Sequence, residues 1–207
     1  MAVCFALAEE AGPFNKQCGD AVPVFYTGIG RVNAEKAVKE YLQNHSPGLL
    51  LTCGFAGGLA AGLKVGDIIF EVSAKGGEAV RAKLTVAGAK EAKIICVDRI
   101  ASTAKEKQQL RETTGADAAE MESGAVQAVC RERGIPCATV RVISDTAEED
   151  LPLDFNQFLT PEKTLDMSKL MMAVAKAPWK MGALMKLQNN TKQAAQRLGE
   201  TLAKVVG

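Results

Sequence analysis

The chain has 207 residues, of which 47% are hydrophobic and 24% are charged, a composition typical of one globular domain with a full core. The formal net charge is +1 at pH 7, so overall charge does not favour a nucleic-acid partner or an anionic membrane. No apolar run approaches the roughly 18 residues that a transmembrane helix needs, and the N-terminus lacks the basic start of a signal peptide. We therefore expect a cytoplasmic protein with no transmembrane segment.

Strand-like and helical runs alternate along the chain. Apolar and β-branched runs predict strands over 3–7, 22–26, 49–53, 65–72, 94–97 and 137–143. Helical spacing predicts helices over 34–42 and 102–113, the second capped by Ser102, and a third helix that Ser123 caps. This alternation predicts an α/β layered fold with a largely parallel sheet. Residues 73–93 give no clear pattern.

We expect one domain over residues 1–207, with a helical C-terminal tail from about residue 164 that is broken near Pro178-Trp179. The last helix carries an apolar stripe of Ala194, Ala195, Leu198, Leu202 and Val205. Five methionines precede this stripe: Met167, Met171, Met172, Met181 and Met185. We interpret them as core-packing residues, with the lining of an apolar ligand site as the alternative.

The six cysteines form no C-x-x-C pair, and four of them lie in apolar, strand-like runs. This pattern is typical of buried thiols in a reducing compartment, not of disulfides or zinc ligands. The single histidine, His45, lies beside Ser46-Pro47-Gly48 and is interpreted as a loop residue. Serine–histidine–aspartate catalysis and histidine–metal chemistry are therefore nearly excluded, and no metal or organic cofactor is implied.

Three acidic residues stand among apolar neighbours in the stretch 118–147: Glu120, Glu122 and Asp145. Glu122 comes at the N-terminal end of the predicted third helix, and Asp145 follows the predicted strand 137–143. Ligands of open α/β sheets bind beyond the carboxyl ends of strands, where a carboxylate can act as an acid or hold hydroxyl groups. The alternatives are a helix-dipole partner for Glu122 and an N-cap for Asp145.

Two glycine turns follow predicted strands. Gly28-x-Gly30 suggests a dinucleotide-binding turn, but the third glycine is absent and apolar residues 49–51 stand where the ribose-binding acid should end a strand. Gly54–Gly58 either lets backbone approach a ligand closely or makes a tight strand-to-helix connection. Neither turn has the Gly-Lys-Ser/Thr ending of a nucleotide P-loop.

Taken in order, these segments resemble the nucleoside phosphorylase and nucleosidase superfamily, in particular the methylthioadenosine/S-adenosylhomocysteine nucleosidases. The resemblance rests on residues 8–10, 27–32, 54–59, 64–68, 119–122, 140–145 and 153–158. It implies a three-layer α/β/α sandwich around a mixed, largely parallel central sheet. It also implies cleavage of the bond between ribose C1′ and a purine nitrogen in a small-molecule nucleoside.

The resemblance assigns roles by matched position. Asp145 would protonate the purine N7, and burial would help its carboxyl group to hold that proton. Glu10 would position or deprotonate the attacking water, and Glu122 would accept hydrogen bonds from the 2′ and 3′ hydroxyls. Met121 would pack beneath the sugar, and Phe155 would close over the site.

The same resemblance places the purine edge at the backbone of Ile100 and Ala101, where Ile100 replaces the aromatic residue that stacks on the base in the nucleosidases. The other residues expected to contact the substrate are Ala56, Gly57, Glu120 and Ser144. A homo-oligomer, most simply a dimer, is expected because relatives are dimers or hexamers.

Several departures leave alternatives open. Thr52 and Phe55 stand where phosphorylases bind phosphate, which favours water as the nucleophile, although Arg31 could still serve an anion in a phosphate-dependent phosphorylase. The compact chain is also similar to the hopanoid-associated phosphorylase-like branch, which is linked to removing adenine from an adenosylated lipid. The short 73–93 segment and Ile100 leave room for a non-catalytic nucleoside-binding module.

Overall fold

The computed structural model of the protein describes residues 1–73, 77–160 and 166–207. Its central sheet has the strand order β2-β1-β3-β8-β4-β5, and β7 pairs with both β3 and β6. The strands are β1 (Ala2–Phe5), β2 (Val24–Tyr26), β3 (Leu50–Gly58), β4 (Ile68–Ser73), β5 (Lys90–Glu91), β6 (Ile94–Cys96), β7 (Ala118–Glu120) and β8 (Cys137–Asp145). Strands β4 and β7 run antiparallel to β8 and β3, and the other pairs are parallel. The predicted mixed, largely parallel sheet is confirmed.

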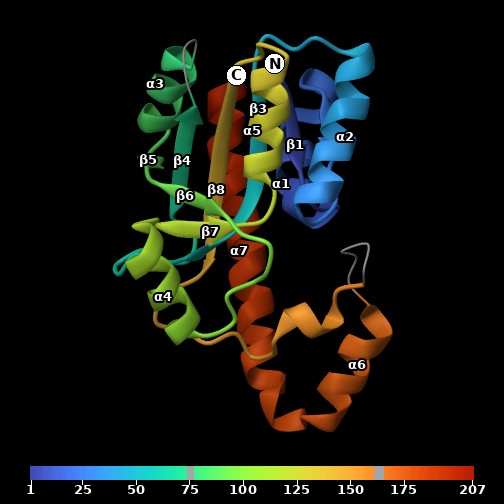
Figure 1. Ribbon diagram of the computed structural model, residues 1–207, viewed down its shortest axis with the longest axis vertical. Helices are drawn as coiled ribbons and strands as arrows, with labels where there is room; N and C mark the ends of the chain where they lie inside the picture. Colours follow the sequence, from blue (N-terminus) through green and yellow to red (C-terminus); the bar gives the residue numbers. More distant parts are fainter. Residues whose placement is uncertain (74–76, 161–165) are drawn as a thin grey trace.

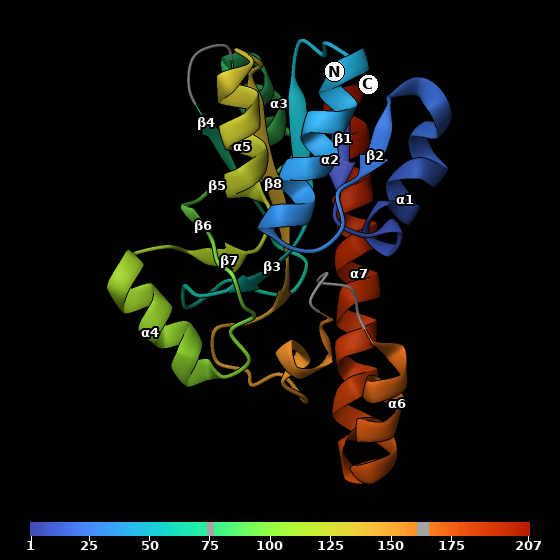
Figure 2. The same ribbon diagram turned by 45° about the vertical axis from the view of Figure 1, so that its right-hand side comes forward.

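Helices cover both faces of this sheet (Figures 1 and 2). One face carries α1 (Ala8–Cys18), α3 (Glu78–Val86) and α7 (Met181–Val206), and the other carries α2 (Arg31–Asn44) and α5 (Ser123–Glu132). Successive side chains of a strand point to opposite faces, so Val3 and Phe5 enter the core beneath α7, whereas Ala2 and Cys4 pack under α2 and α5. The expected three-layer sandwich is therefore confirmed.

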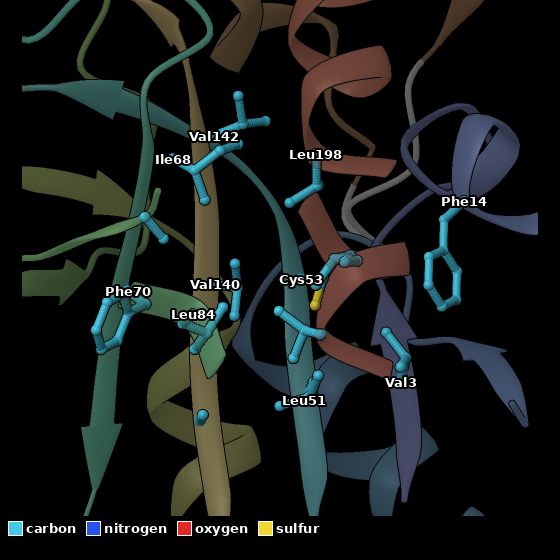
Figure 3. Close-up of a cluster of buried hydrophobic side chains, with 14 of the residues drawn as sticks. Val3, Phe14, Leu51, Cys53, Ile68, Phe70, Leu84, Val140, Val142 and Leu198 are labelled. Carbon is cyan, nitrogen blue, oxygen red and sulfur yellow. The ribbon is translucent and has the colours of Figure 1, made fainter. Parts of the chain in front are cut away.

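The larger core lies between the sheet and α7. Figure 3 shows side chains from several strands gathered beside Leu198, with Cys53 and Val142 among them. All five residues of the predicted apolar stripe in α7 are buried. This helix therefore covers one face of the sheet, and α4 (Ala104–Thr114) lies at the side of the molecule, beside β7 (Figure 1).

Strand β3 is longer than the predicted strand 49–53 because it continues through the second glycine turn to Gly58. The pairing of β3 with β8 shifts register between Ala56 and Gly57, and the shift brings Gly57 opposite Asp145. Of the two interpretations of this turn, the strand-to-helix connection is thus wrong, because a bulge keeps this stretch in the sheet. Strand β7 was not predicted, since three residues are too few to show a period.

Two predicted helix caps are also corrected. Helix α4 begins after Thr103, whose hydroxyl accepts a hydrogen bond from the Glu106 N–H in a capping box, and not after Ser102. Helix α5 begins at Ser123 itself, with Glu122 as the N-cap residue. The first N–H groups of α5 are instead satisfied by the Glu120 carboxylate, which accepts from the N–H groups of Glu122 and Ser123.

The C-terminal region departs most from expectation. It contains η2 (Phe155–Phe158), α6 (Met167–Lys176), η3 (Pro178–Lys180) and α7, so the predicted break near Pro178-Trp179 is confirmed, while the predicted start near residue 164 lies outside the described residues. No residue between 166 and 193 is buried. The five methionines of the tail are exposed, so their interpretation as core-packing residues is wrong. Among the described residues, no helix has both the length and the apolar character needed to cross a bilayer.

Helices α1 and α7 approach closely at Gly199, where an added Cβ would lie 2.8 Å from the Phe14 nitrogen and 2.9 Å from the Pro13 carbonyl carbon. We expect Gly199→Ala to lower the free energy of unfolding by about 1–3 kcal/mol, because backbone cannot yield as a side chain can. Urea denaturation would measure the loss. Gly182→Ala is the matched control in the same helix, where no atom lies within 4 Å of the added Cβ. Equal stability of the two variants would contradict the close approach.

Candidate active site

A cavity of about 320 Å³ opens at the carboxyl ends of β3 and β8. Its walls come from the β1–α1 connection, β3, the β7–α5 junction, the end of β8, the segment before α4, η2 and the middle of α7. All the predicted site residues line it: Glu10, Ala56, Gly57, Ile100, Ala101, Glu120, Met121, Glu122, Ser144, Asp145 and Phe155. The chain thus brings together residues that are up to 145 positions apart in the numbering.

Glu10 enters the cavity from the first turn of α1. Its carboxylate accepts hydrogen bonds from the N–H groups of Leu7 (2.9 Å) and Phe55 (3.0 Å). Burial raises the pKa of Glu10 above its ordinary value, although these two N–H groups act to lower it. A Cβ at Gly54 would lie 2.8 Å from Glu10 Oε1, so the second glycine turn supplies the space that this carboxylate occupies.

Arg141 is a fully buried cation in the middle of β8. Its guanidinium donates to the Thr52 carbonyl (2.8 Å) and hydroxyl (3.2 Å) and to Glu120 Oε2 (2.5 Å). Burial acts to lower the pKa of Arg141, but the carboxylates of Glu120 and Glu122 hold it above its ordinary value. Only Nε of this guanidinium has no partner among the described residues. Arg141 therefore remains charged and neutralises part of the acidic cluster around it.

Glu120 accepts more hydrogen bonds than Glu10, Glu122 or Asp145 does. Besides Arg141, it accepts from the N–H groups of Glu122 and Ser123 and from the Ser123 hydroxyl (2.7 Å). Burial alone would raise its pKa, but Arg141 and Ser123 outweigh burial and hold the pKa below the ordinary value. Because both oxygens of Glu120 accept from the protein, its geometry suits a residue that orients the start of α5.

Glu122 has one oxygen fixed and one facing the cavity. Its Oε1 accepts a hydrogen bond from the Gly30 N–H at 2.8 Å, and no described residue donates to Oε2. Burial, followed by the nearby Glu120 carboxylate, raises the pKa of Glu122 to about 7, against the opposing effects of Arg141 and the Gly30 N–H. The first glycine turn, with φ of +86° at Gly30, therefore positions a carboxylate and not a dinucleotide phosphate.

Asp145 is paired with a cation at the end of β8. Lys107, which is fully buried on α4, places its ammonium 2.7 Å from Asp145 Oδ2, and the Ser144 hydroxyl donates to Oδ1 at 2.6 Å. The same ammonium donates to the carbonyls of Thr146 (2.6 Å) and Glu149 (2.8 Å). An ion pair thus stands where the sequence suggested an acid held only by burial.

The segment before α4 carries the predicted purine-edge residues, and their backbone groups are not equivalent. The N–H of Ile100 donates to Asn156 Oδ1 (2.8 Å), and the Asn156 amide donates back to the Ile100 carbonyl (2.9 Å). No described residue bonds the N–H or the carbonyl of Ala101. Ala101, and not Ile100, therefore has a free backbone donor and acceptor beside the cavity.

The residues considered for phosphate binding do not form an anion site. Thr52 is buried, and its hydroxyl accepts from Arg141, while the Phe55 N–H donates to Glu10. Arg31 does not line the cavity, and its guanidinium lies 3.3 Å from Asp98. The Phe55 N–H and the Thr52 hydroxyl are therefore already bonded to Glu10 and Arg141.

Sequence reasoning missed Lys107, Arg141 and Asn156, which hold the predicted residues in place. Arg141 gave a signal, since a charged residue in a β-branched run such as Val140-Arg141-Val142 needs a buried partner. Lys107 gave none, because it stands among Lys105, Glu106 and Gln108 in a polar helix.

Comparisons with known proteins identify the family of the chain. The family model described as the phosphorylase superfamily matches residues 14–71 and 70–176. A 5′-methylthioadenosine/S-adenosylhomocysteine nucleosidase from Shewanella halifaxensis is 30% identical over 173 residues, which cover 68% of this chain and 75% of that protein.

Solved structures share the whole fold at lower identity. The futalosine hydrolase of Helicobacter pylori superposes with a TM-score of 0.73 at 19% identity, covering 99% of this chain and 96% of that one. A 5′-methylthioadenosine/S-adenosylhomocysteine nucleosidase from Colwellia psychrerythraea, solved in complex with adenine, gives a TM-score of 0.72 at 16% identity, covering 100% of this chain and 93% of that one.

The Arg141–Glu120 pair gives a test of the buried cluster. We expect Arg141→Met to lower the free energy of unfolding by about 3–5 kcal/mol, because it leaves buried carboxylates uncompensated. Arg141→Met combined with Glu120→Gln should lose less than the two single losses together, as urea denaturation at neutral pH would measure. The exposed pair Lys39–Glu35, separated by 2.5 Å, is the control, and its removal should change little. Strict additivity at Arg141 and Glu120 would contradict the coupling.

Proposed function

Because the chain belongs to the phosphorylase superfamily and is an enzyme of the N-glycosyl hydrolase kind, we propose that it releases adenine from an adenine nucleoside, with water as the nucleophile. The observation that carries this proposal is that Glu10, Glu122 and Asp145 all line the same cavity. Hydrolysis of an N-ribosidic bond passes through an oxocarbenium-like transition state, which carries positive charge on the sugar. A cavity rich in carboxylates suits that charge and a neutral substrate.

Glu10 is proposed to handle the attacking water. Its carboxylate is fixed by two backbone N–H groups and keeps a raised pKa, so it can accept a proton as the water oxygen bonds to C1′. Its fixed position also limits the approach of the water to one side of the sugar. The proton passes from the water to Glu10, and the oxygen stays on the ribose.

Glu122 is proposed to bind the ribose. Its Oε2 faces the cavity without a protein donor and can accept hydrogen bonds from the 2′ and 3′ hydroxyls. Glu120 supports this role by holding the N–H groups at the start of α5, while Met121 lines the wall between the two carboxylates. In its ionised form, Glu122 also favours the developing positive charge on the sugar.

Asp145 is proposed to protonate the leaving base. Asp145 takes up a proton from solvent before the reaction. As the C1′–N9 bond breaks, its electron pair passes into the purine, and N7 takes that proton from the Asp145 carboxyl group. Ser144 and Lys107 fix both carboxylate oxygens, so they orient this group toward the cavity. After transfer, the Lys107 ammonium stabilises the carboxylate that remains.

Ala101 is proposed to select adenine. Its free N–H can donate to N1, and its free carbonyl can accept from the exocyclic amine at C6. Hypoxanthine would present an oxygen to that carbonyl and would lose this pairing. Asn156 supports the selection because it holds Ile100 from both sides and so fixes the adjacent backbone. Phe155 and Ile100 supply apolar walls for the base and the sugar.

A nucleoside with a larger apolar 5′ group, as in an adenosylated lipid, is a second candidate substrate. The cavity has an apolar wall of Leu151, Phe155 and Leu187. A second hollow of about 200 Å³ shares Asp145, Leu151 and Leu187 with it, and its other lining residues include Ala183 of α7 and the charged Glu149 and Lys186. This extension gives room for a substituent longer than a methylthio group.

We also infer a reducing, cytoplasmic environment, because all six cysteines are free thiols. A homodimer remains the expected assembly. The phosphate-dependent alternative is weakened, because the candidate residues Thr52 and Phe55 already contact Arg141 and Glu10. The non-catalytic alternative is weakened because the complete set of predicted residues lines one cavity.

The proposed reaction is tested by adenine release from a panel of nucleosides, with and without inorganic phosphate. The panel holds 5′-methylthioadenosine, adenosine, inosine and an adenosine with a bulky apolar 5′ group. We expect adenine release without phosphate and weak activity on inosine. A strict requirement for phosphate would overturn hydrolysis, and equal rates on inosine would overturn the role of Ala101.

Asp145→Asn should lower kcat by about 10²–10⁴-fold, because the amide cannot give up a proton. Lys107→Met should also lower kcat while the folded state remains detectable by circular dichroism. Asp20→Asn, an exposed aspartate far from the cavity, is the control and should keep full activity. Full base release by Asp145→Asn would show that another group supplies the proton.

The raised pKa of Glu122 predicts a pH dependence. Below about pH 7 the carboxyl group of Glu122 is protonated in the free enzyme and cannot accept from both ribose hydroxyls. We therefore expect kcat/KM to rise with pH up to about 7 and then level off. The same raised pKa means that the free energy of unfolding falls as pH increases from 4.5 to about 7, because the carboxyl group ionises in the unfolded chain while it stays protonated in the folded state.

The variant Glu122→Gln tests whether Glu122 causes the pH dependence of both kcat/KM and the free energy of unfolding. The amide should abolish the inflection near pH 7 in kcat/KM and flatten the fall in unfolding free energy over the same range. Persistence of both inflections in Glu122→Gln would assign them to Glu10 or another group.

A further inference from the structure

The residues 166–185 form a helical hairpin that extends beyond the sheet. They comprise Asp166, α6, η3 and the first turn of α7, and Figures 1 and 2 show α6 and this end of α7 reaching away from both chain termini. None of these residues is buried. The apolar side chains of this amphipathic hairpin are therefore not covered by any other described part of the chain.

The hairpin exposes large apolar side chains. Trp179 in η3 is 77% exposed, and Met171 in α6 is 69% exposed. They are accompanied by Met167, Met172, Met181 and Met185, so that, among the residues that the structure describes, six of the eleven exposed large hydrophobic residues lie within nineteen consecutive positions. Single exposed apolar residues are common, but such a concentration marks an interaction surface.

The hairpin and the part of α7 that follows it are strongly basic. Residues 167–199 contain six lysines and arginines and no aspartate or glutamate, although the whole chain has a net charge of only +1. Lys169 and Lys186 pair with Asp166 and Glu149. Lys176, Lys180 and Lys192 form no ion pair with any described residue. The free positive charges therefore accompany the exposed methionines and the tryptophan.

We propose that this hairpin docks the protein on an anionic membrane surface. Helices that lie in a bilayer interface combine an apolar face with lysines, and tryptophan favours the depth of the lipid headgroups. Two copies of the hairpin that faced each other would bring like charges together, which disfavours a symmetric contact through this surface. An anionic bilayer accepts both the positive charge and the apolar side chains.

Docking would bring the cavity near the lipid. Leu187 and Thr191, which line the cavity, lie on α7 directly after the hairpin. A substrate with an apolar substituent could then enter from the bilayer side. The docking itself does not depend on the identity of the substrate, so its test needs no catalytic readout.

Trp179 is the only tryptophan of the chain and lies on the proposed surface, so its fluorescence reports docking directly. We expect an emission blue shift and co-flotation with vesicles of phosphatidylcholine mixed with phosphatidylglycerol, and neither with phosphatidylcholine alone. Binding should weaken as sodium chloride is added, because surface charge is screened.

Variants separate the two contributions. Lys176→Glu combined with Lys180→Glu and Lys192→Glu should reduce vesicle affinity by at least about tenfold. Met171→Ser combined with Met172→Ser should weaken binding while the charge is unchanged. The control reverses three exposed basic residues away from the hairpin, Lys16→Glu, Lys105→Glu and Arg131→Glu, and should bind as the unaltered protein does.

Three outcomes would overturn the proposal. One is equal affinity of the hairpin and control charge variants, and another is absence of binding to anionic vesicles. The third is a Trp179 blue shift that grows with protein concentration without vesicles, together with dimer formation in sedimentation, which would assign the surface to a second copy of the chain. Circular dichroism of each variant establishes that it is folded.

Discussion

The site depends on one buried cation. Arg141 lies in the middle of β8, donates to Thr52 of β3 and to Glu120 of β7, and so connects three strands whose ends form the cavity. Carboxylates cannot remain charged in a buried cluster without such compensation. Arg141 holds Glu120 ionised, and Glu120 in turn raises the pKa of Glu122. The electrostatic state of Glu120, and through it that of Glu122, thus depends in part on one residue that does not line the cavity itself.

Backbone geometry supplies the second constraint. Gly30 donates its N–H to Glu122, Gly54 leaves room for Glu10, and Gly57 approaches Asp145, whose Oδ2 would lie 3.3 Å from an added Cβ. Both glycine turns therefore bring carboxylates close to the main chain. This use differs from dinucleotide binding, in which the same kind of turn brings backbone close to a phosphate. A glycine turn after a strand can therefore occur both in a site that binds a phosphate and in a site whose carboxylates stabilise a positive transition state.

The six longer or more apolar strands and the helices α2, α4 and α5 were predictable, because buried strands and amphipathic helices leave clear periods in the sequence. Helices α1 and α3 and the short strands β5 and β7 were not predicted. The grouping of Glu10, Glu122 and Asp145 came from the resemblance, since residues so far apart carry no local sign that they meet. The partners Lys107 and Asn156 could not be predicted, because a polar residue in a polar stretch does not reveal which way it points. The methionines of the tail gave the wrong prediction for a related reason: apolar spacing indicates a helical face, but not what covers that face.

The net charge of +1 conceals an uneven distribution of charge. The cavity contains four carboxylates against Arg141 and Lys107, so it repels anions and favours a neutral nucleoside that becomes positive as it reacts. The hairpin, in contrast, is basic and lies where α7 leaves the cavity wall. Positive charge placed there can draw the protein to an anionic surface without lowering the negative potential around the reacting sugar, because the two regions are separated along α7 and solvent screens exposed charges. The uneven distribution therefore allows one small chain to carry both a cation-stabilising site and a surface that binds anions.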